Sequence, residues 1–223
     1  MIKKHLDKLI KIGQEDIGYL GNNSLIWAKS VIKNKTKIDS SLSQKFDRRD
    51  LLAYCNNPKK SNLNVGIAIL SWGGMRRNHG RILFNNNFSS LNTLITNLRK
   101  NKYSTRIKAF DAFQSERSKG NLPGLGIGYF TKLIFFLAPN LNGYIMDQWA
   151  GKSINLLAGK QIVSFYNSWV NDKNNAETYD IFCKNIDELA VILNCSGSEA
   201  EERIFSIGHG KGTWRIYLNC NLK

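Results

Sequence analysis

The sequence predicts an all-α protein of about ten short helices, with room for a strand or two. Apolar residues recur at helical spacing along most of the 223-residue chain. No segment shows the alternation of strands and helices that builds parallel βαβ units, and no internal repeat is visible. The length allows a substantial core, arranged either as one large domain or as two lobes around a cleft.

The N-terminal part of the chain is predicted to be helical. Residues 2–33 carry apolar side chains at helical spacing that are interrupted near Gly18 and Gly21, which predicts two helices. The segment from Asp47 to Cys55 predicts another helix. It is followed by a turn at Asn57, because a residue before proline disfavours the helical conformation.

The apolar run from Val65 to Leu70 fits either a buried strand or a buried helix by periodicity alone. We predict a helix, because no neighbouring segment offers a partner strand with hairpin chemistry. Amphipathic patterns predict helices at 90–99 and 104–118, and Ser104 is the expected cap of the second. Later helices are expected at 148–157, 161–170, 179–193 and 198–207.

The chain is strongly basic. It carries 32 Lys and Arg against 17 Asp and Glu, a formal net charge of +15, and the basic residues are spread along the sequence. This balance favours a polyanionic partner, most simply nucleic acid, since each neutralised phosphate releases condensed counterions. A basic composition inherited from an AT-rich genome is the alternative explanation.

The sequence gives little indication of a membrane-spanning protein or of a metal-binding site. The longest apolar run, Leu133 to Ala138, is far shorter than the roughly 18 residues that span a bilayer, and the N-terminus lacks an apolar signal core. We therefore expect a cytoplasmic monomer without membrane contact. The four cysteines form no CxxC pair and the three histidines no HxxxH pair, so neither zinc nor an iron–sulfur cluster is predicted.

Trp72, Gly73 and Gly74 precede a basic cluster that contains Arg76 and His79. An aromatic ring beside glycines and positive charges can line a base pocket or grip a nucleic-acid backbone. The alternative is a core tryptophan at a helix end, next to solvated arginines.

The segment from Leu122 to Trp149 holds three candidate features. LPGLG predicts a tight turn between two helices, in which Gly124 and Gly126 allow positive φ or the close approach of another molecule. Lys132 lies within an apolar run, where burial would favour a neutral, nucleophilic amine, although its head could also extend to solvent. Asp147 precedes a helical pattern and suits an N-cap.

Together these features resemble the helix-hairpin-helix superfamily of DNA glycosylases. LPGLG between helices, with Asp147 downstream, is similar to the motif that names the superfamily, and WGGM at Trp72 and FTKLIFFL before IMDQW resemble its 8-oxoguanine DNA glycosylase-like branch. The resemblance implies one two-lobed helical domain over residues 1–223, with a cleft between the lobes and the motif and catalytic segment at about 104–158. It also implies an enzyme that flips a damaged or modified base out of double-stranded DNA and cleaves its N-glycosidic bond.

The resemblance assigns binding roles to the hairpin. The amides of Gly124, Gly126 and Gly128 would hold a DNA phosphate in the favourable field of a helix N-terminus. The carbonyl groups of Leu122 and Leu125 would hold a structural monovalent cation, Na or K. No cofactor is expected to be required for the chemistry.

The resemblance also assigns catalytic roles. Asp147 lies at the position of the superfamily's carboxylate, which stabilises positive charge on the sugar. Bifunctional members usually carry their lysine at the seventh residue of the LPG motif, which is Gly128 here. Lys132 lies four residues later (132 − 128 = 4) on the same helix face, so it is the candidate for a Schiff base with the sugar. The shift leaves lyase activity open, because hydrolysis assisted by Asp147 needs no lysine.

The expected base pocket combines the basic cluster with residues beside the carboxylate: Trp72, Arg76, His79, Gln148 and Trp149. Repair of 8-oxoguanine and removal of modified bases from foreign DNA, as in defence against phage, are both open. The rival from another class is a non-catalytic protein that uses the hairpin and its charge only to bind DNA.

Overall fold

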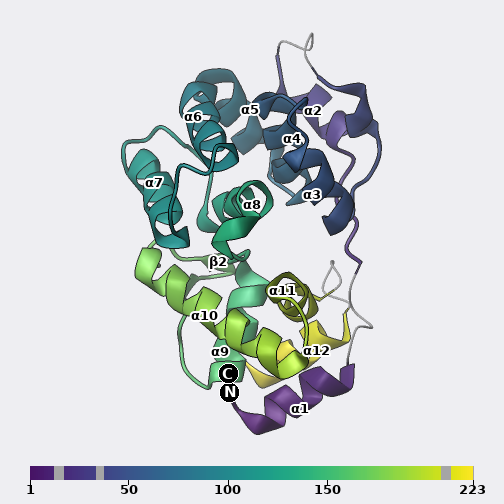
Figure 1. The fold of residues 1–223 in the computed structure, drawn as a ribbon, viewed down its shortest axis with the longest axis vertical. Coiled ribbons are helices and arrows are strands. Elements are labelled where there is room, and N and C mark those ends of the chain that lie inside the picture. Colours follow the sequence, from purple (N-terminus) through teal and green to yellow (C-terminus); the bar gives the residue numbers. More distant parts are fainter. Residues whose placement is uncertain (13–17, 34–37, 207–211, 223) are drawn as a thin grey trace. The chain divides into compact units, whose positions relative to one another are not determined.

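The computed structural model describes residues 1–12, 18–33, 38–206 and 212–222. Within these ranges the regular structure consists of twelve α-helices, short 3-10 turns and one two-stranded sheet (Figure 1). The prediction of a mostly helical protein is therefore confirmed. By its internal contacts the chain divides into two compact units. We call Leu20–Gly143 the central unit, and Met1–Tyr19 with Tyr144–Lys223 the terminal unit, and describe each by itself.

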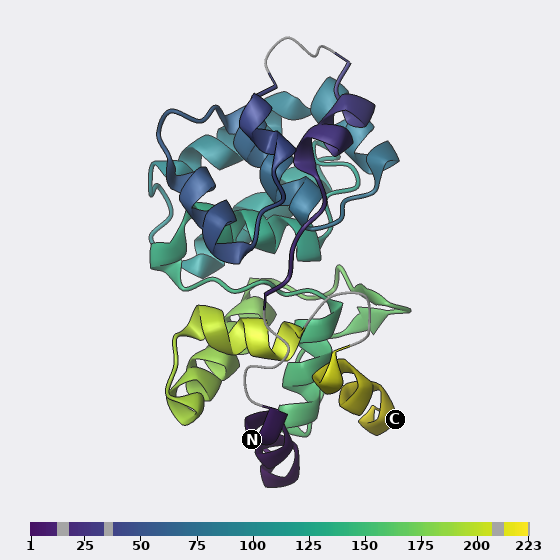
Figure 2. The same cartoon turned by 90° about the vertical axis from the view of Figure 1, so that its right-hand side faces the viewer.

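In its described residues, the central unit contains seven α-helices, seen from a second side in Figure 2. They are α2 (Ser24–Val31), α3 (Arg48–Asn56), α4 (Asn62–Trp72), α5 (Arg77–Asn86), α6 (Phe88–Arg99), α7 (Arg106–Ser118) and α8 (Ile127–Leu137). The same described part of the chain also contains the 3-10 turns η2 (Ser40–Ser43) and η3 (Pro139–Leu141). Helix α8 contacts α3, α4, α6 and α7, so it forms the centre of this core.

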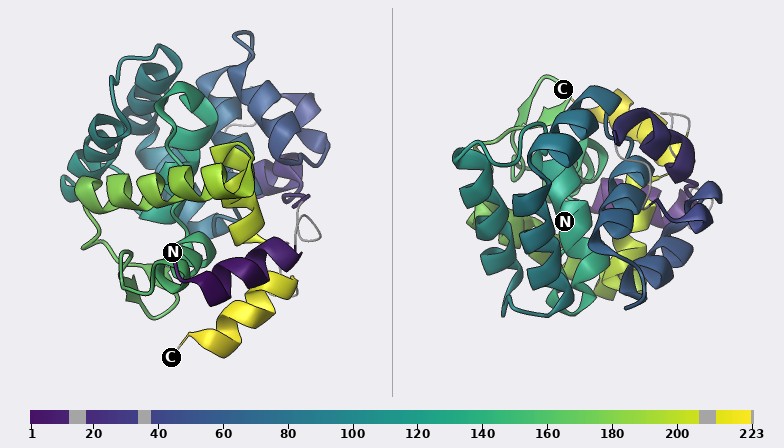
Figure 3. Two further views of the ribbon diagram at one scale, coloured as in Figure 1. Left: turned by 60° about the horizontal axis from the view of Figure 1, so that its bottom comes forward. Right: turned by 90° about the horizontal axis from the view of Figure 1, so that it is seen from above.

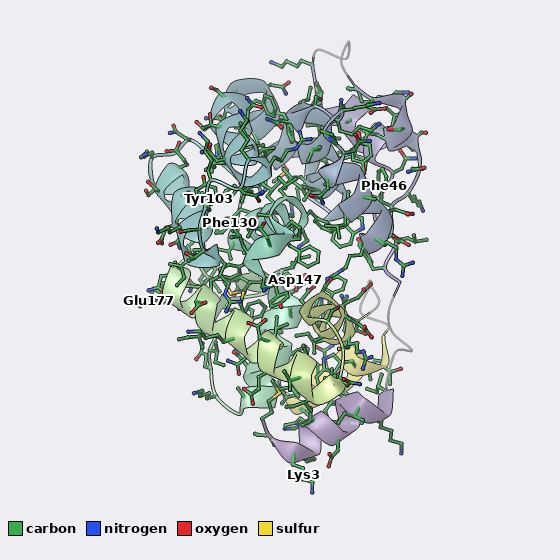
Figure 4. The ribbon with its side chains drawn as sticks, viewed as in Figure 1. Lys3, Phe46, Tyr103, Phe130, Asp147 and Glu177 are labelled. Atoms are coloured by element: carbon green, nitrogen blue, oxygen red, sulfur yellow. The ribbon has the colours of Figure 1, made fainter. Side chains whose placement is uncertain are left out.

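Helix α8 is central because it is rich in large apolar side chains, and nine of its eleven residues are buried. The ring of Phe130, labelled in Figure 4, lies on this helix. It stacks on Phe113 with 5.2 Å between centroids and meets Phe110 edge-on at 4.8 Å. Burial of each such side chain contributes about 1.5–3 kcal/mol. The helix predicted at Val65–Leu70 is confirmed as part of α4, and it too is buried all round.

The terminal unit is assembled around α9 (Gln148–Ala158). The other elements are α1 (Lys3–Ile12), β1 (Phe165–Tyr166), β2 (Trp169–Val170), α10 (Ala176–Leu193), α11 (Gly197–Phe205) and α12 (Thr213–Asn221). Helix α9 contacts α1, α10, α11, α12 and β2, and α1 lies beside α12 (Figure 3). This unit therefore joins segments from both ends of the sequence.

Two expectations from the sequence are wrong. Residues 161–170 form a loop and an antiparallel hairpin instead of a helix, with Phe165 opposite Val170 and Tyr166 opposite Trp169. The hairpin turns through Asn167, whose positive φ of 53° a helix cannot accommodate. The cap of α7 is Thr105, whose side chain accepts the amide of Lys108, and not Ser104.

Among the helices described, none is long and apolar enough to cross a membrane. All four cysteines lie in the described ranges as thiols outside any disulfide, and Cys55 and Cys183 are buried. Burial raises the pKa of the Cys55 thiol far above its ordinary value, so this side chain behaves as a neutral core residue.

Candidate functional site

The LPGLG segment forms the predicted tight turn. The amide of Leu125 donates to the carbonyl of Leu122 at 3.2 Å, with Pro123 and then Gly124 at the two central positions. The φ of Gly124 is +74°, as a type II turn requires at its third residue. A Cβ added at Gly124 would also lie 2.7 Å from the Cβ of His79. Glycine is therefore needed here both for the backbone and for the packing of α5.

The turn leads directly into the N-terminus of α8. Gly126 is the N-cap residue and offers no side chain to the helix, and its carbonyl accepts the amides of Tyr129 and Phe130. Within the described ranges, the amides of Gly126, Ile127 and Gly128 have no hydrogen-bond acceptor. A Cβ added at Gly126 would meet nothing within 4 Å, so there is open space beside its Cα. Such a set of amides is suited to an anion.

Lys132 is held inside the central unit. It is 6% exposed, and its Nζ donates to the carbonyl oxygen of Gly128 at 2.8 Å. This hydrogen bond arises because helical side chains lean toward the N-terminus of their helix. The Nζ is thus directed back toward the LPGLG turn instead of extending to solvent.

The glycine of the WGGM motif makes room for Lys132. A Cβ added at Gly73 would lie 2.7 Å from the Cδ and 3.0 Å from the Cε of Lys132. The hydroxyl of Tyr129 donates to the carbonyl of Gly74 at 3.4 Å, which ties the same segment to α8. The sequence showed the WGGM motif and the lysine as separate features, and the structure brings them into contact.

The central-unit candidates for a base pocket occupy different environments. Trp72 is 2% exposed and meets the ring of Phe136 edge-on at 5.2 Å, as expected of a core tryptophan. Arg76 is exposed at the start of α5. His79 is half-buried, and its Nδ1 has no hydrogen-bond partner in the part of the chain that the structure describes. Their roles in base binding stay predictions.

Asp147 is the N-cap of α9, as its sequence context predicted (Figure 4). Its Oδ1 accepts the amides of Trp149 and Ala150 at 2.9 and 3.0 Å. The side chain is half-buried. Two hydrogen bonds to one oxygen fix the position of the carboxylate at the positive end of the helix.

A cluster that the sequence did not reveal lies beside Asp147 in the terminal unit. Arg215 of α12 is 3% exposed, and its guanidinium lies 4.6 Å from the ring of Trp149 and 4.5 Å from that of Phe205. Its Nε donates to the carbonyl of Phe205 at 2.8 Å. The ring of Tyr19 packs edge-on against Phe205 at 5.6 Å.

The electrostatics of Tyr19 connect this cluster to the carboxylate. Burial raises the pKa of the Tyr19 phenol, the positive charge of Arg215 opposes the shift, and the negative charge of Asp147 adds to it. Tyr19 is therefore a neutral hydroxyl within electrostatic range of both groups.

Trp149, predicted as a pocket residue, holds Arg215 against its ring, while Gln148 is half-buried at the first position of α9. Only the local sequence TWRIYL, an arginine among aromatic residues, hints at Arg215.

The predicted site residues thus form two groups. The hairpin, Lys132 and the WGGM segment belong to the central unit, and Asp147, Gln148 and Trp149 belong to the terminal unit. Among the residues that the structure describes, no group of three or more His, Cys, Asp or Glu side chains could hold a metal ion. A monovalent cation at the hairpin would use carbonyl oxygens, which suit a hard ion, although the carbonyl of Leu122 already accepts the amide of Leu125.

Comparison with known proteins assigns a family. Residues 23–205 match the family model OGG, described as "Putative 8-oxoguanine DNA glycosylase OGG-like protein". No curated protein and no solved structure matches the chain. The matched residues include the hairpin, Lys132, Asp147 and the WGGM segment. The chain therefore belongs to the 8-oxoguanine DNA glycosylase OGG-like family.

Proposed function

We propose that the protein is a DNA N-glycosylase in which Asp147 supports cleavage of the N-glycosidic bond. The observation that carries this proposal is the fixed position of the Asp147 carboxylate, which accepts two amides at the start of α9. In the reaction the bond from the base to the anomeric carbon breaks, the base leaves with the bonding electrons, and positive charge develops on the sugar. A carboxylate held in place stabilises that charge without reorganisation.

The hairpin would supply the grip on the DNA backbone. The amides of Gly126, Ile127 and Gly128 lie at the N-terminus of α8, and a phosphate would accept hydrogen bonds from them. Gly124 would shape the turn that presents them. The net charge of +15 supports binding to DNA, and a monovalent cation at the hairpin carbonyls belongs to the same proposal.

Lys132 would act as the nucleophile of a lyase reaction. Its neutral amine would attack the anomeric carbon and displace the base, which leaves with the bonding electrons and takes up a proton. Loss of a proton from nitrogen would give an N-glycoside, whose C1′–O4′ bond would then break, with O4′ taking a proton, to leave a protonated Schiff base. The hydrogen bond from Nζ to the carbonyl of Gly128 supports this role, because it places the amine one turn nearer to the hairpin than the Cα of Lys132. Hydrolysis by water, assisted by Asp147, is the path that needs no lysine.

Gly73→Ala tests the placement of Lys132. The φ of −71° at Gly73 is accessible to alanine, whereas the new methyl group would lie 2.7 Å from the Cδ of Lys132. The side chain must move, and its amine would lose the carbonyl of Gly128. We expect covalent trapping with borohydride on DNA to fall about 100-fold. The melting temperature should fall only modestly, because displacing one buried side chain costs about 1–3 kcal/mol. Wild-type trapping would show that the amine does not depend on this position.

Membership of the family indicates the class of substrate, a modified base in DNA, and not the particular base. We propose 8-oxoguanine in DNA as the first substrate and modified bases of foreign DNA, including phage DNA, as the second. The second rests on Gly128, which replaces the usual lysine. A two-lobed architecture with the flipped base in a cleft belongs to the same proposal.

Release of free base is the direct test. Duplexes that each contain one modified base are incubated with the full-length protein, and the released base is identified by mass spectrometry. We expect free 8-oxoguanine from its duplex and no base from unmodified DNA. Release of another modified base, without release of 8-oxoguanine, would indicate that the substrate is foreign DNA. Binding of every duplex without any release would favour the non-catalytic DNA-binding protein.

A further inference from the structure

The hairpin of β1 and β2 displays two aromatic side chains. Tyr166 is 70% exposed and Trp169 is 53% exposed. They are directly opposite in the antiparallel register, so both rings stand on the same face of the hairpin. Figure 2 shows the hairpin as a pair of arrows that extends away from the helices of its unit. We call Tyr166 and Trp169 the aromatic pair.

The opposite face of the hairpin anchors it to α9. Phe165 lies against Gly151, where an added Cβ would be 2.9 Å from the Cζ of Phe165. The amide of Gly151 in turn donates to the carbonyl of Asp147 at 2.9 Å, which closes the first turn of the helix. The hairpin is therefore attached one helical turn from the candidate catalytic carboxylate, within the same unit.

Two asparagines fix the chain that leads into the hairpin. The Oδ1 of Asn155 accepts the amides of Ile162 and Val163 at 2.9 and 2.8 Å, and its Nδ2 donates to the carbonyl of Val163. Asn174 accepts the amide of Ser164 at 2.9 Å and donates to the carbonyl of the same residue. The hairpin is thus held in place although its aromatic pair contributes little to the core.

The surroundings of the aromatic pair match a nucleobase better than a protein. Lys160 and Lys173 are exposed on the flanking loops, where Asp172 is the single acidic residue between Ala158 and Ala176. A stable protein interface needs about 800 Å² from each partner, far more than two rings in a polar loop provide. A base needs only a ring face, and its phosphates complement the lysines.

We propose that the aromatic pair is a stacking site for an unpaired base of the DNA, beside the nucleotide on which Asp147 acts. This inference rests on the proposed function for its choice of DNA. A flipped nucleotide leaves its former partner without a stacking neighbour, and bases next to it are also partly exposed. Tyrosine and tryptophan rings on a fixed hairpin would stack on such a base without sequence preference.

The test measures binding to a duplex that carries a stable abasic analogue, so that no base can be released. Loss of aromatic stacking is expected to weaken binding by Tyr166→Ala/Trp169→Ala about 5- to 150-fold. Tyr166→Phe/Trp169→Phe keeps two aromatic rings and should bind within about threefold of wild type. Val191→Ala, at an 81% exposed position of α10, is the matched surface control and should have no effect.

A second readout identifies the contact. With 2-aminopurine opposite the abasic analogue, wild-type protein should change the fluorescence of the probe, and the alanine variant should not. Equal affinity of the alanine variant and wild type would overturn the proposal. An equal loss of affinity for fully paired DNA would also overturn it, by assigning the pair to backbone contacts. Because the assay involves no chemistry, its result is independent of whether Asp147 is catalytic.

Discussion

Asp147→Asn is expected to slow base release by about 100- to 1,000-fold, the usual effect of removing one group that stabilises transition-state charge. Asparagine keeps the shape of the side chain, and its oxygen can still accept the amides of Trp149 and Ala150. Asparagine caps helices as well as aspartate, so α9 should remain intact. The variant therefore removes the negative charge and little else. The rate is measured in a single turnover with enzyme in excess over the modified duplex.

A matched control separates the charge from the cap. Asp47 caps α3 in the same way, accepting the amide of Asp50 at 2.7 Å, and it lies in the central unit. Asp47→Asn should leave base release and melting temperature unchanged. Asp147→Ala should lose about 1 kcal/mol of stability in addition to its activity, because it removes the cap. Base release by Asp147→Asn at the wild-type rate would exclude the carboxylate from the reaction.

Lys132→Ala is expected to abolish covalent trapping by borohydride, and Gly128→Lys in the same chain is expected to restore part of it. The physical reason is the 2.8 Å hydrogen bond that brings the Nζ of Lys132 to the carbonyl of Gly128. Residues 128 and 132 share one face of α8, so a lysine at either position can direct an amine to the same side of the helix. Trapped complexes are separated on a denaturing gel.

The double variant also provides a control for Gly73→Ala. In the Gly128→Lys/Lys132→Ala variant the side chain of Lys132 is absent, so a methyl group added at Gly73 displaces nothing there. Adding Gly73→Ala to this variant should therefore leave its covalent trapping unchanged. Trapping that survives Lys132→Ala unchanged would assign the nucleophile to another amine. Base release without any trapping by wild-type protein would identify a hydrolase that uses water.

The sequence predicted those features that depend on neighbouring residues. The buried run before Trp72 was correctly interpreted as a helix, and Asp147 as an N-cap, because both follow from local pattern and local hydrogen bonding. The hairpin at 165–170 was missed. Its conformation depends on Asn155 and Asn174, which bond to the loop from helix α9 and from the segment before α10.

Contacts between distant segments likewise could not be predicted from the sequence. Nothing near Gly73 indicates that its missing side chain admits Lys132, and nothing near Asp147 points to Arg215 of α12. Such contacts come from packing between helices, for which a single sequence carries no periodic signal. The family resemblance supplied candidate roles for Asp147 and Lys132, and the structure supplied their neighbours.

The terminal unit is formed by two separate stretches of the chain, which affects the order in which the protein folds during translation. The central unit is one continuous stretch, whereas α9 contacts both α1 and α12, and the amide of Ile2 donates to the carbonyl of Leu157 at 2.6 Å. Domains generally fold as units while the chain emerges from the ribosome. The LPGLG turn and Lys132 can therefore be folded while Arg215 is still unsynthesised. A nascent chain would therefore contain the turn proposed to bind DNA before the residues around Asp147 are complete.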